Sequence, residues 1–197
     1  CDRRSRASAS SADLVATKTI GELGVFEMRE AGLVEVEDPS ARFVGEATAA
    51  PGSVVLCAME GTRPLLVEVQ ALVAPTEVVP PRRVANGIDR NRLAMILAVL
   101  ARHGGVGVGG ADVFVNVAGG VRVDEPGADL AIALAVASAH RGEPLSDSEG
   151  RPLACFGEVG LTGELRYVAH VERRVAEARK FGLAPVLGPF VREAPAG

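Results

Sequence analysis

The chain has 197 residues, a formal net charge of −4 and an apolar fraction of 48%. This length suffices for one domain with a substantial core. The acidic balance argues against a protein that holds nucleic acid over its whole surface, although it leaves room for a local basic stripe. Aromatic residues make up only 4%, so we expect a core of Val, Leu, Ile and Ala, as is usual in α/β proteins.

The cysteines and the apolar runs indicate the compartment. Cys1, Cys57 and Cys155 are far apart and odd in number, which argues against a disulfide framework. No apolar run approaches the roughly 20 residues that span a bilayer. The basic N-terminus lacks the apolar segment of a secretory signal. We therefore expect a cytoplasmic protein without a membrane partner.

Composition and turn residues divide the chain into four segments. Residues 1–19 are polar and small and predict a disordered or non-native leader. Residues 20–47 predict a hairpin, turning at Ala31–Gly32, followed by a linker with prolines. Residues 48–191 form the main domain, and residues 192–197 form a tail.

The first half of the main domain predicts strands and one helix. Residues 53–59 and 65–73 read as strands, and in the second strand apolar residues alternate with Glu68 and Gln70, which indicates one buried face. A loop over 75–81 leads to a helix over about 89–103, which ends at Gly104.

The second half continues the alternation. Strands are predicted at 112–118, 153–159, 164–168 and 184–187, and helices at about 126–140 and 169–181. The helix over 126–140 is apolar almost all round and should be the central buried helix. Because strands and helices alternate without a regular βαβ period, we predict a mixed-sheet α/β or α+β domain.

Nucleotide and metal sites are not expected. A P-loop needs a lysine after its glycines, and neither Lys18 nor Lys180 has that context. The G-x-G-x-x-G pattern at 105–110 follows a helix and precedes a strand, opposite to a dinucleotide fingerprint, and predicts a flexible connection. The histidines lie on three different predicted elements without ligand spacing, so no metal is expected. They are His103, His140 and His170.

Two stretches carry a family resemblance, DVFVNVAGGVRVDEPGADLAIAL at 112–134 and FGEVGLTGELRYVAHVERRVAEARKFG at 156–182. Both resemble the proteolytic domain of Lon, in which a serine at the start of a buried helix is the nucleophile and a lysine on a later helix is the base. The resemblance implies a Lon proteolytic-domain-like, ribosomal protein S5 domain 2-like fold, with a mixed sheet and packed helices.

The Lon pattern places unsuitable residues at both catalytic positions. The serine position is Gly127, and counting on from the hairpin motif at 157–163 gives Glu172 for the lysine. A hydroxyl needs a nearby base to become nucleophilic, so the resemblance implies vestigial dyad positions and no peptidase. Asp124, Glu125 and Asp129 could form a carboxylate metal site, but we favour stabilisation of the helix start.

The bacterial RadA/Sms family of DNA-repair proteins has Asp-Glu-Pro, two small residues and Asp at this turn, as residues 124–129 do here. The segments at 24–28, 60–73 and 81–100 also resemble that family. The family's Lys-Asn-Arg-Phe-Gly motif is missing after Lys18. The hairpin at 20–36 resembles the last strands of the family's RecA-like ATPase. ATP, Mg and Zn are expected only in an N-terminal part of the parent protein that this chain lacks.

The resemblance implies a scaffold and DNA-contact domain in ATP-driven recombination and repair, including branch migration. Its implied partners are single-stranded or branched DNA, further copies in a homo-hexamer, and the recombinase RecA or replicative machinery. Arginines would contact phosphates without reading sequence, although solvated arginines often only pair with nearby acids. The candidates are Arg82, Arg83, Arg90, Arg92, Arg122, Arg173 and Arg174.

Two alternatives remain open. One is a divergent Lon-type serine peptidase with a relocated dyad, which would hydrolyse unfolded casein. The other is a purely structural module that forms rings and never contacts DNA.

Overall fold

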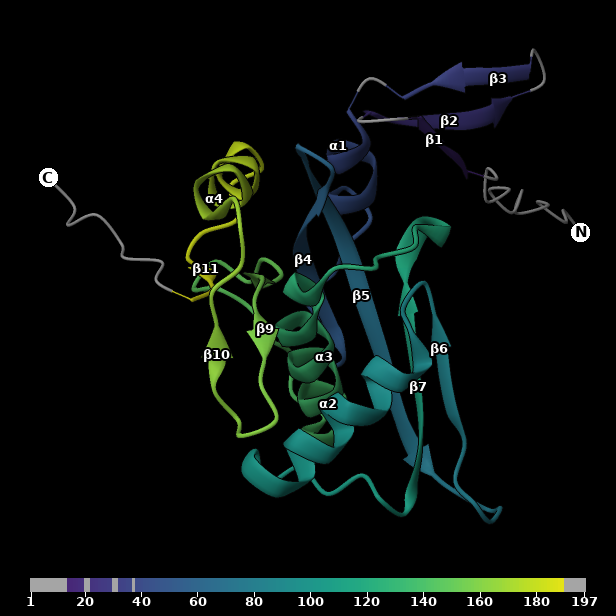
Figure 1. Cartoon of the computed structure of the whole chain (residues 1–197), viewed down its shortest axis with the longest axis vertical. Helices are drawn as coiled ribbons and strands as arrows, with labels where there is room; N and C mark the ends of the chain where they lie inside the picture. Colours follow the sequence, from purple (N-terminus) through teal and green to yellow (C-terminus); the bar gives the residue numbers. More distant parts are fainter. Residues whose placement is uncertain (1–13, 20–21, 30–31, 37, 190–197) are drawn as a thin grey trace, which may run out of the picture.

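The structure, a computed structural model, describes residues 14–19, 22–29, 32–36 and 38–189 (Figure 1). The tail predicted at 192–197 and most of the leader predicted at 1–19 lie outside these residues.

The N-terminal part is a three-stranded antiparallel sheet in the order β1-β2-β3. Strands β2 (Glu22–Arg29) and β3 (Gly32–Glu35) form the predicted hairpin, closed by the pair Arg29 and Gly32. Strand β1 (Leu14–Thr19) pairs with β2, so the leader prediction was wrong for these six residues. Their sequence, LVATKT, is rich in residues that favour strands, but the polar run before it dominated the prediction.

The main domain is built on a six-stranded mixed sheet in the order β11-β8-β4-β5-β7-β6. The pairs β4–β5 and β5–β7 are antiparallel, and the other three pairs are parallel. The mixed α/β class is therefore confirmed. A separate hairpin joins β9 to β10. The strands are β4 (Ser53–Glu60), β5 (Arg63–Pro75), β6 (Arg83–Asn86), β7 (Ala111–Val117), β8 (Ala154–Cys155), β9 (Glu158–Val159), β10 (Leu165–Arg166) and β11 (Val186–Leu187).

The three helices predicted for the main domain are confirmed as α2 (Arg90–His103), α3 (Asp129–Arg141) and α4 (Val171–Lys180). The Asp89 carboxylate caps α2 by accepting a hydrogen bond of 2.9 Å from the Arg92 amide. Helix α3 follows a short 3₁₀ turn, η2 (Pro126–Ala128).

Two short elements were not predicted. Helix α1 (Pro39–Val44) lies where a linker was expected, and Asp38 caps it by accepting from the Ala41 amide at 3.2 Å. The Ser40 hydroxyl accepts from the Leu66 amide at 3.2 Å, so α1 is attached directly to β5. The second element is strand β6, which pairs in parallel with β7.

Helix α3 is the centre of the core. Figure 1 shows α2 and α3 in front of the sheet formed by β4, β5 and β7. On α3, Ala131, Ile132, Ala135 and Val136 are fully buried, as its nearly uniform apolar sequence predicted. The core continues into the sheet through the buried valines of β4, β5 and β7. This helix therefore fixes the position of the turn that precedes it.

The two faces of α2 supply a test of the core. Ile96→Ala should lower the free energy of unfolding by about 2–5 kcal/mol, because Ile96 is 2% exposed and its removal leaves a cavity. The neighbouring Met95 is 46% exposed, and Met95→Ala should change the free energy of unfolding by only about 0.5 kcal/mol. Urea unfolding of both variants measures the difference, and equal losses would contradict this packing.

Candidate functional site

The turn before α3 is where the sequence places the vestigial nucleophile. Glu125 is extended, with φ −102° and ψ 147°, and Pro126 opens the 3₁₀ turn, as suits a first helical position. Gly127 is buried, and its carbonyl accepts from the Gly157 amide at 2.8 Å. A Cβ at Gly127 would lie 3.0 Å from Arg174 Nη1 and 3.0 Å from Glu125 Oε2. The position is thus bounded by a guanidinium and a carboxylate.

Arg174 of α4 is the charged group at this turn. Its side chain is 2% exposed and forms a bidentate ion pair with Glu125, at 2.8 Å from Nη1 to Oε1 and 2.5 Å from Nη2 to Oε2. Nη1 also donates to the Cys57 carbonyl at 2.7 Å, and Nε donates to the Ala169 carbonyl at 3.0 Å. The guanidinium carbon lies 5.4 Å from the ring centroid of Phe156. Arg174 therefore connects α4, β4 and the turn before α3.

Glu125 is held from a second side. Its Oε1 accepts a hydrogen bond of 2.7 Å from the Met59 amide on β4. A buried ion pair is stable only when its remaining hydrogen-bonding groups are satisfied. Here backbone groups of β4 and of the loop before α4 complete the pair. We call this arrangement, Glu125 with Arg174 beside Gly127, the Arg174 pair.

The structure does not bring the two predicted dyad positions together. Glu172 is exposed on α4, and the residue that faces Gly127 is Arg174. Arg174 was also predicted to contact DNA, but a side chain 2% exposed has no surface to offer a phosphate. The missed signal was helical period: Val171, Arg174 and Ala178 are spaced by three and four residues, and so share one face.

Two thiols and one hydroxyl in this part of the core, those of Cys57, Cys155 and Ser138, are buried. Burial raises the pKa of the Cys57 thiol to about 12, although the nearby Arg174 acts to lower it. Burial likewise raises the pKa of Cys155 well above its usual value. Ser138 is buried further along α3, where its hydroxyl accepts from the Gly52 amide at 2.9 Å and donates to the Glu143 carbonyl at 2.5 Å. Each of these groups is better explained by packing than by reaction chemistry.

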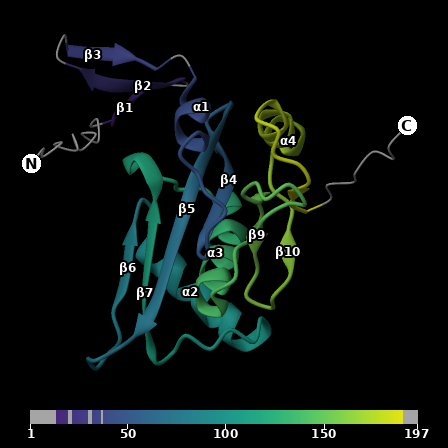
Figure 2. The ribbon, with the colours of Figure 1, turned by 180° about the vertical axis from the view of Figure 1, so that it is seen from behind.

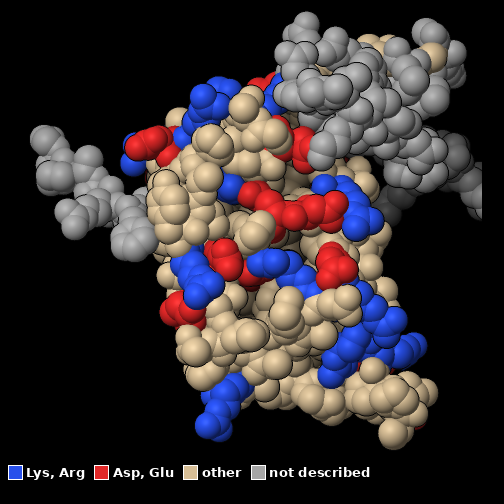
Figure 3. Space-filling model, in the orientation of Figure 1, with Lys and Arg blue, Asp and Glu red and all other residues tan. Residues whose placement is uncertain are grey.

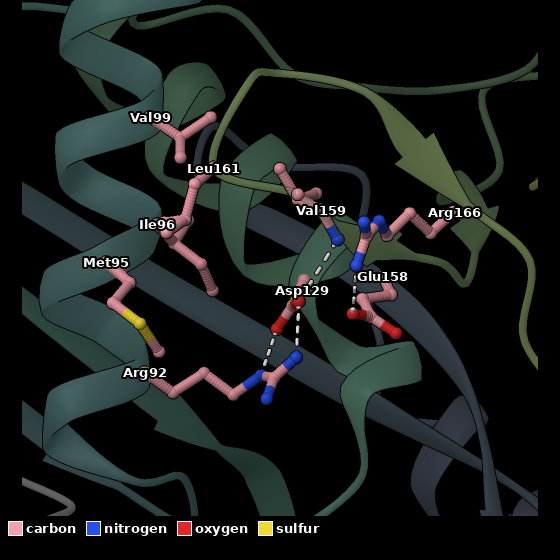
Figure 4. A pocket seen from close by; sticks show the side chains of 10 residues that line it. Arg92, Met95, Ile96, Val99, Asp129, Glu158, Val159, Leu161 and Arg166 are labelled. Atoms are coloured by element: carbon pink, nitrogen blue, oxygen red, sulfur yellow. Dashed lines mark hydrogen bonds and ion pairs between the residues drawn. The ribbon is translucent and has the colours of Figure 1, made fainter.

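Asp129 forms a second ion pair at the same helix start, with Arg92, whose side chain is 29% exposed. Its carboxylate is 2% exposed, binds the Nε and Nη2 of Arg92, and accepts from the Val159 amide at 3.1 Å. The pair borders a pocket of about 170 Å³ between α2 and the β9–β10 hairpin, with Met95, Ile96 and Leu161 on its apolar wall (Figure 4). Arg92, which was predicted to contact DNA, therefore joins α2 to α3 through this ion pair.

The acidic residues of this turn do not form a metal cluster. Within the described part of the chain, no group of three or more His, Cys, Asp or Glu side chains is arranged to hold a metal ion. Asp129 stands in the first turn of α3, where an acid favours the helix dipole. The helix has no side-chain cap, however, so the expected capping role is replaced by pairing with arginine. Asp124 likewise pairs with Arg122.

Arg82 and Arg83 flank the start of β6. Arg82 pairs with the fully buried Asp112, and the Arg82 amide and guanidinium together hold the pKa of this carboxyl below its usual value. Arg83 donates instead to the backbone carbonyls of Arg82, Val108, Gly109 and Ala111. It ties the loop before β7 to β6, which is a structural role that the sequence did not predict.

The remaining predicted arginines are exposed. Arg122 donates to both Asp124 oxygens at 2.9 Å, and Arg173 donates to the Thr62 carbonyl at 2.9 Å. The Val123 amide donates to the Gly87 carbonyl at 2.8 Å, so the segment carrying Arg122 runs beside the chain that leads to Arg90. On the face of the molecule that is seen in Figure 1, basic and acidic side chains are interspersed (Figure 3).

The neighbours Arg173 and Arg174 test the site. Arg174→Ala should lower the free energy of unfolding by about 3–5 kcal/mol, because it leaves the Glu125 carboxylate without its partner. Arg173→Ala removes an exposed group and should cost about 0.5 kcal/mol or less. Replacing both partners, with Arg174→Met and Glu125→Gln, should recover part of the stability. Chemical denaturation measures all three variants, and an Arg174→Ala protein as stable as the parent would refute the role of the pair.

Among the residues described, no helix is both long and apolar enough to cross a bilayer.

Comparison with known proteins gives a consistent result. The chain is 49% identical to DNA repair protein RadA of Bacillus subtilis over 170 residues, which are 85% of this chain and 36% of that protein. It is 51% identical to DNA repair protein RadA of Pseudomonas aeruginosa, and 50% identical to that of Escherichia coli, each over 182 residues, 90% of this chain and 39% of the relative. No family model matches the chain.

The chain spans little more than a third of the length of these relatives. The match to one segment is consistent with a C-terminal domain, and the resemblance predicted from the motifs is confirmed. With about half of its residues identical over 85–90% of its length, this chain is a homologue of one segment of the DNA repair protein RadA.

Proposed function

We propose that this chain is a non-catalytic, Lon-like scaffold and DNA-contact domain of a RadA-type repair protein. The observation that carries the proposal is the Arg174 pair, which occupies the turn where a Lon-type nucleophile and base would stand. The relatives supply the biological context through their name, DNA repair protein RadA. The branch migration of recombination intermediates, driven by ATP, belongs to this proposal as an activity of the whole protein.

The chemistry of the turn argues against hydrolysis. A covalent hydrolase needs a nucleophile and a group that takes its proton. Gly127 has no side chain, and an arginine side chain offers only N–H donors and no acceptor for the proton of a nucleophile. Its donors are engaged by Glu125, Cys57 and Ala169. The turn therefore has a structural use that is incompatible with a dyad at the same place.

The proposed DNA contacts are made by those predicted arginines whose side chains are exposed. Arg92 and Arg174 are paired inside the domain, and Arg83 binds backbone carbonyls. Arg82, Arg90, Arg122 and Arg173 are exposed and can reach phosphates. Such contacts give binding that is independent of sequence and sensitive to salt. We propose single-stranded or branched DNA as the ligand, with a homo-hexamer as the assembly and RecA or replicative proteins as further partners.

Cofactors are assigned outside the matched segment. We place ATP, Mg²⁺ and Zn²⁺ in the parts of RadA-type proteins that this chain does not match, because its own sequence has no P-loop lysine.

The peptidase alternative has a direct test. The purified chain should release no fluorescent peptide from labelled casein, and a fluorophosphonate probe should leave every serine unmodified by mass spectrometry. Casein turnover that persists through purification, together with a probe adduct on one serine of this chain, would establish a peptidase with a relocated dyad.

Salt dependence tests the DNA contacts. Replacing Arg90 and Arg122 with alanine should weaken binding of a single-stranded oligonucleotide and reduce the slope of log K against log salt by roughly 0.7 for each phosphate that is no longer neutralised. The control replaces Arg42 and Arg141, which are exposed and lie outside the proposed DNA-binding set. Fluorescence anisotropy measures both. If the parent chain fails to bind DNA at low salt, the purely structural alternative holds.

A further inference from the structure

We propose that the open face of the sheet at β5, β7 and β6 is a stacking platform for the bases of single-stranded nucleic acid. This inference rests on the proposed DNA contact and names the surface and the form of nucleic acid that it would take. It also assigns part of the binding to apolar side chains, which the arginine-based prediction did not include.

Strand register places three apolar side chains in one row across this face. Phe114 on β7 pairs with Leu72 on β5 and with Val84 on β6. Side chains alternate along a strand, and the residues beside them, Val113 and Val115, point into the core. Leu72 is 60% exposed and Val84 is 45% exposed, and Phe114 between them is half-buried.

The row on one side is polar, and the row on the other side pairs Ala74 with the buried Asp112, beside Arg82. One row holds amides, since Gln70, Asn116 and Asn86 occupy paired positions and Asn86 Nδ2 donates to Asn116 Oδ1 at 2.6 Å. Each amide carries two donors and an acceptor, so this bond leaves groups that can bind base edges. On the other side, the guanidinium carbon of Arg82 lies 5.6 Å from the centroid of the Phe114 ring.

The charge of this surface suits a polyanion. Asp112, beside Phe114 on the same face, is 0% exposed and paired with Arg82, so its carboxylate is both covered and neutralised. Arg82 itself is 60% exposed at its side chain, which leaves it accessible from solvent. The face therefore combines an aromatic ring, a cation and amides, which are the groups that bind stacked bases and their backbone.

The open position of this face is visible from behind. Figure 2 shows β5, β7 and β6 with α2 and α3 on their far side, and α1 near one end of β5. Adjacent strands are about 4.8 Å apart, so the apolar row spans roughly 10 Å across three strands. This width suits single bases. A duplex would present phosphates, not base faces, to the apolar row, so the geometry favours a single strand.

Because the chain has no tryptophan, a single introduced tryptophan reports on stacking. Leu72→Trp places the reporter in the row, and Met95→Trp places a matched reporter on α2, where Met95 is 46% exposed. Titration with oligo(dT) should quench the fluorescence of Leu72→Trp to saturation and leave Met95→Trp unchanged. Duplex DNA of the same length should quench Leu72→Trp less.

A second pair of variants tests affinity. Leu72→Asp with Val84→Asp should weaken oligo(dT) binding about tenfold or more, because bases can no longer stack on the row. Met95→Asp should leave the affinity within about twofold of the parent, since phosphate contacts are unaffected. Urea unfolding of each variant verifies that the fold is retained.

The outcomes separate this inference from the proposed function. If the chain binds oligo(dT) but the quench is absent in Leu72→Trp or equal in Met95→Trp, the platform is refuted and the DNA contact stands. If the chain binds no DNA, both are refuted. If Leu72→Trp fluorescence changes with protein concentration without DNA, the row is an interface between copies, and the platform is likewise refuted.

Discussion

The buried pair of Arg174 and Glu125 is the interaction on which the rest of this domain depends. It joins a helix near the C-terminal end of the described chain to a central strand and to the turn before the central helix. Removing a charged pair from water is costly, and only a complete set of hydrogen bonds offsets that cost. The Met59 amide and the Cys57 and Ala169 carbonyls complete the set. The charges of this pair thus connect three separate segments of the chain.

The same principle applies one turn further on. Asp129 and Arg92 join α3 to α2, and the Val159 amide adds the β9–β10 hairpin. The two pairs surround the start of one helix, where a peptide dipole already favours a negative group. Four elements that are far apart in sequence, α2, α4, β4 and the β9–β10 hairpin, are therefore positioned by side chains from a single hexapeptide, residues 124–129. The residue types at positions 125 and 129 are thus determined by the arginines and amides that they bind.

Much of the fold was predictable from sequence, because it rests on long periodic segments. The central helix over 126–140 and the strands at 53–59 and 65–73 were found from apolar patterning alone. The short elements were missed because tertiary contacts define them. Helix α1 depends on the Asp38 cap and on Ser40 bound to β5, and β6 depends on its pairing with β7.

The site was only half predictable. The resemblance to the Lon turn identified Gly127, which lies in the 3₁₀ turn before the buried helix. The motif assigned the second position to the exposed Glu172, whereas the side chain beside Gly127 is that of Arg174, because counting along a motif gives sequence distance and not direction. Arg174 was treated as a surface group on the strength of its charge, although its spacing from Val171 and Ala178 placed it inward. For Arg174, helical periodicity indicated burial more reliably than the charge of the side chain indicated exposure.

The close fit at Gly127 has a consequence for how this turn can change over evolutionary time. Because a Cβ there would lie 3.0 Å from both Arg174 and Glu125, a side chain at this position requires these two groups to shift by a few tenths of an ångström. Introducing a hydroxyl and removing the guanidinium are then coupled changes, and each alone passes through a less stable protein. The choice of residue at this turn is therefore tied to the geometry of the ion pair that surrounds it.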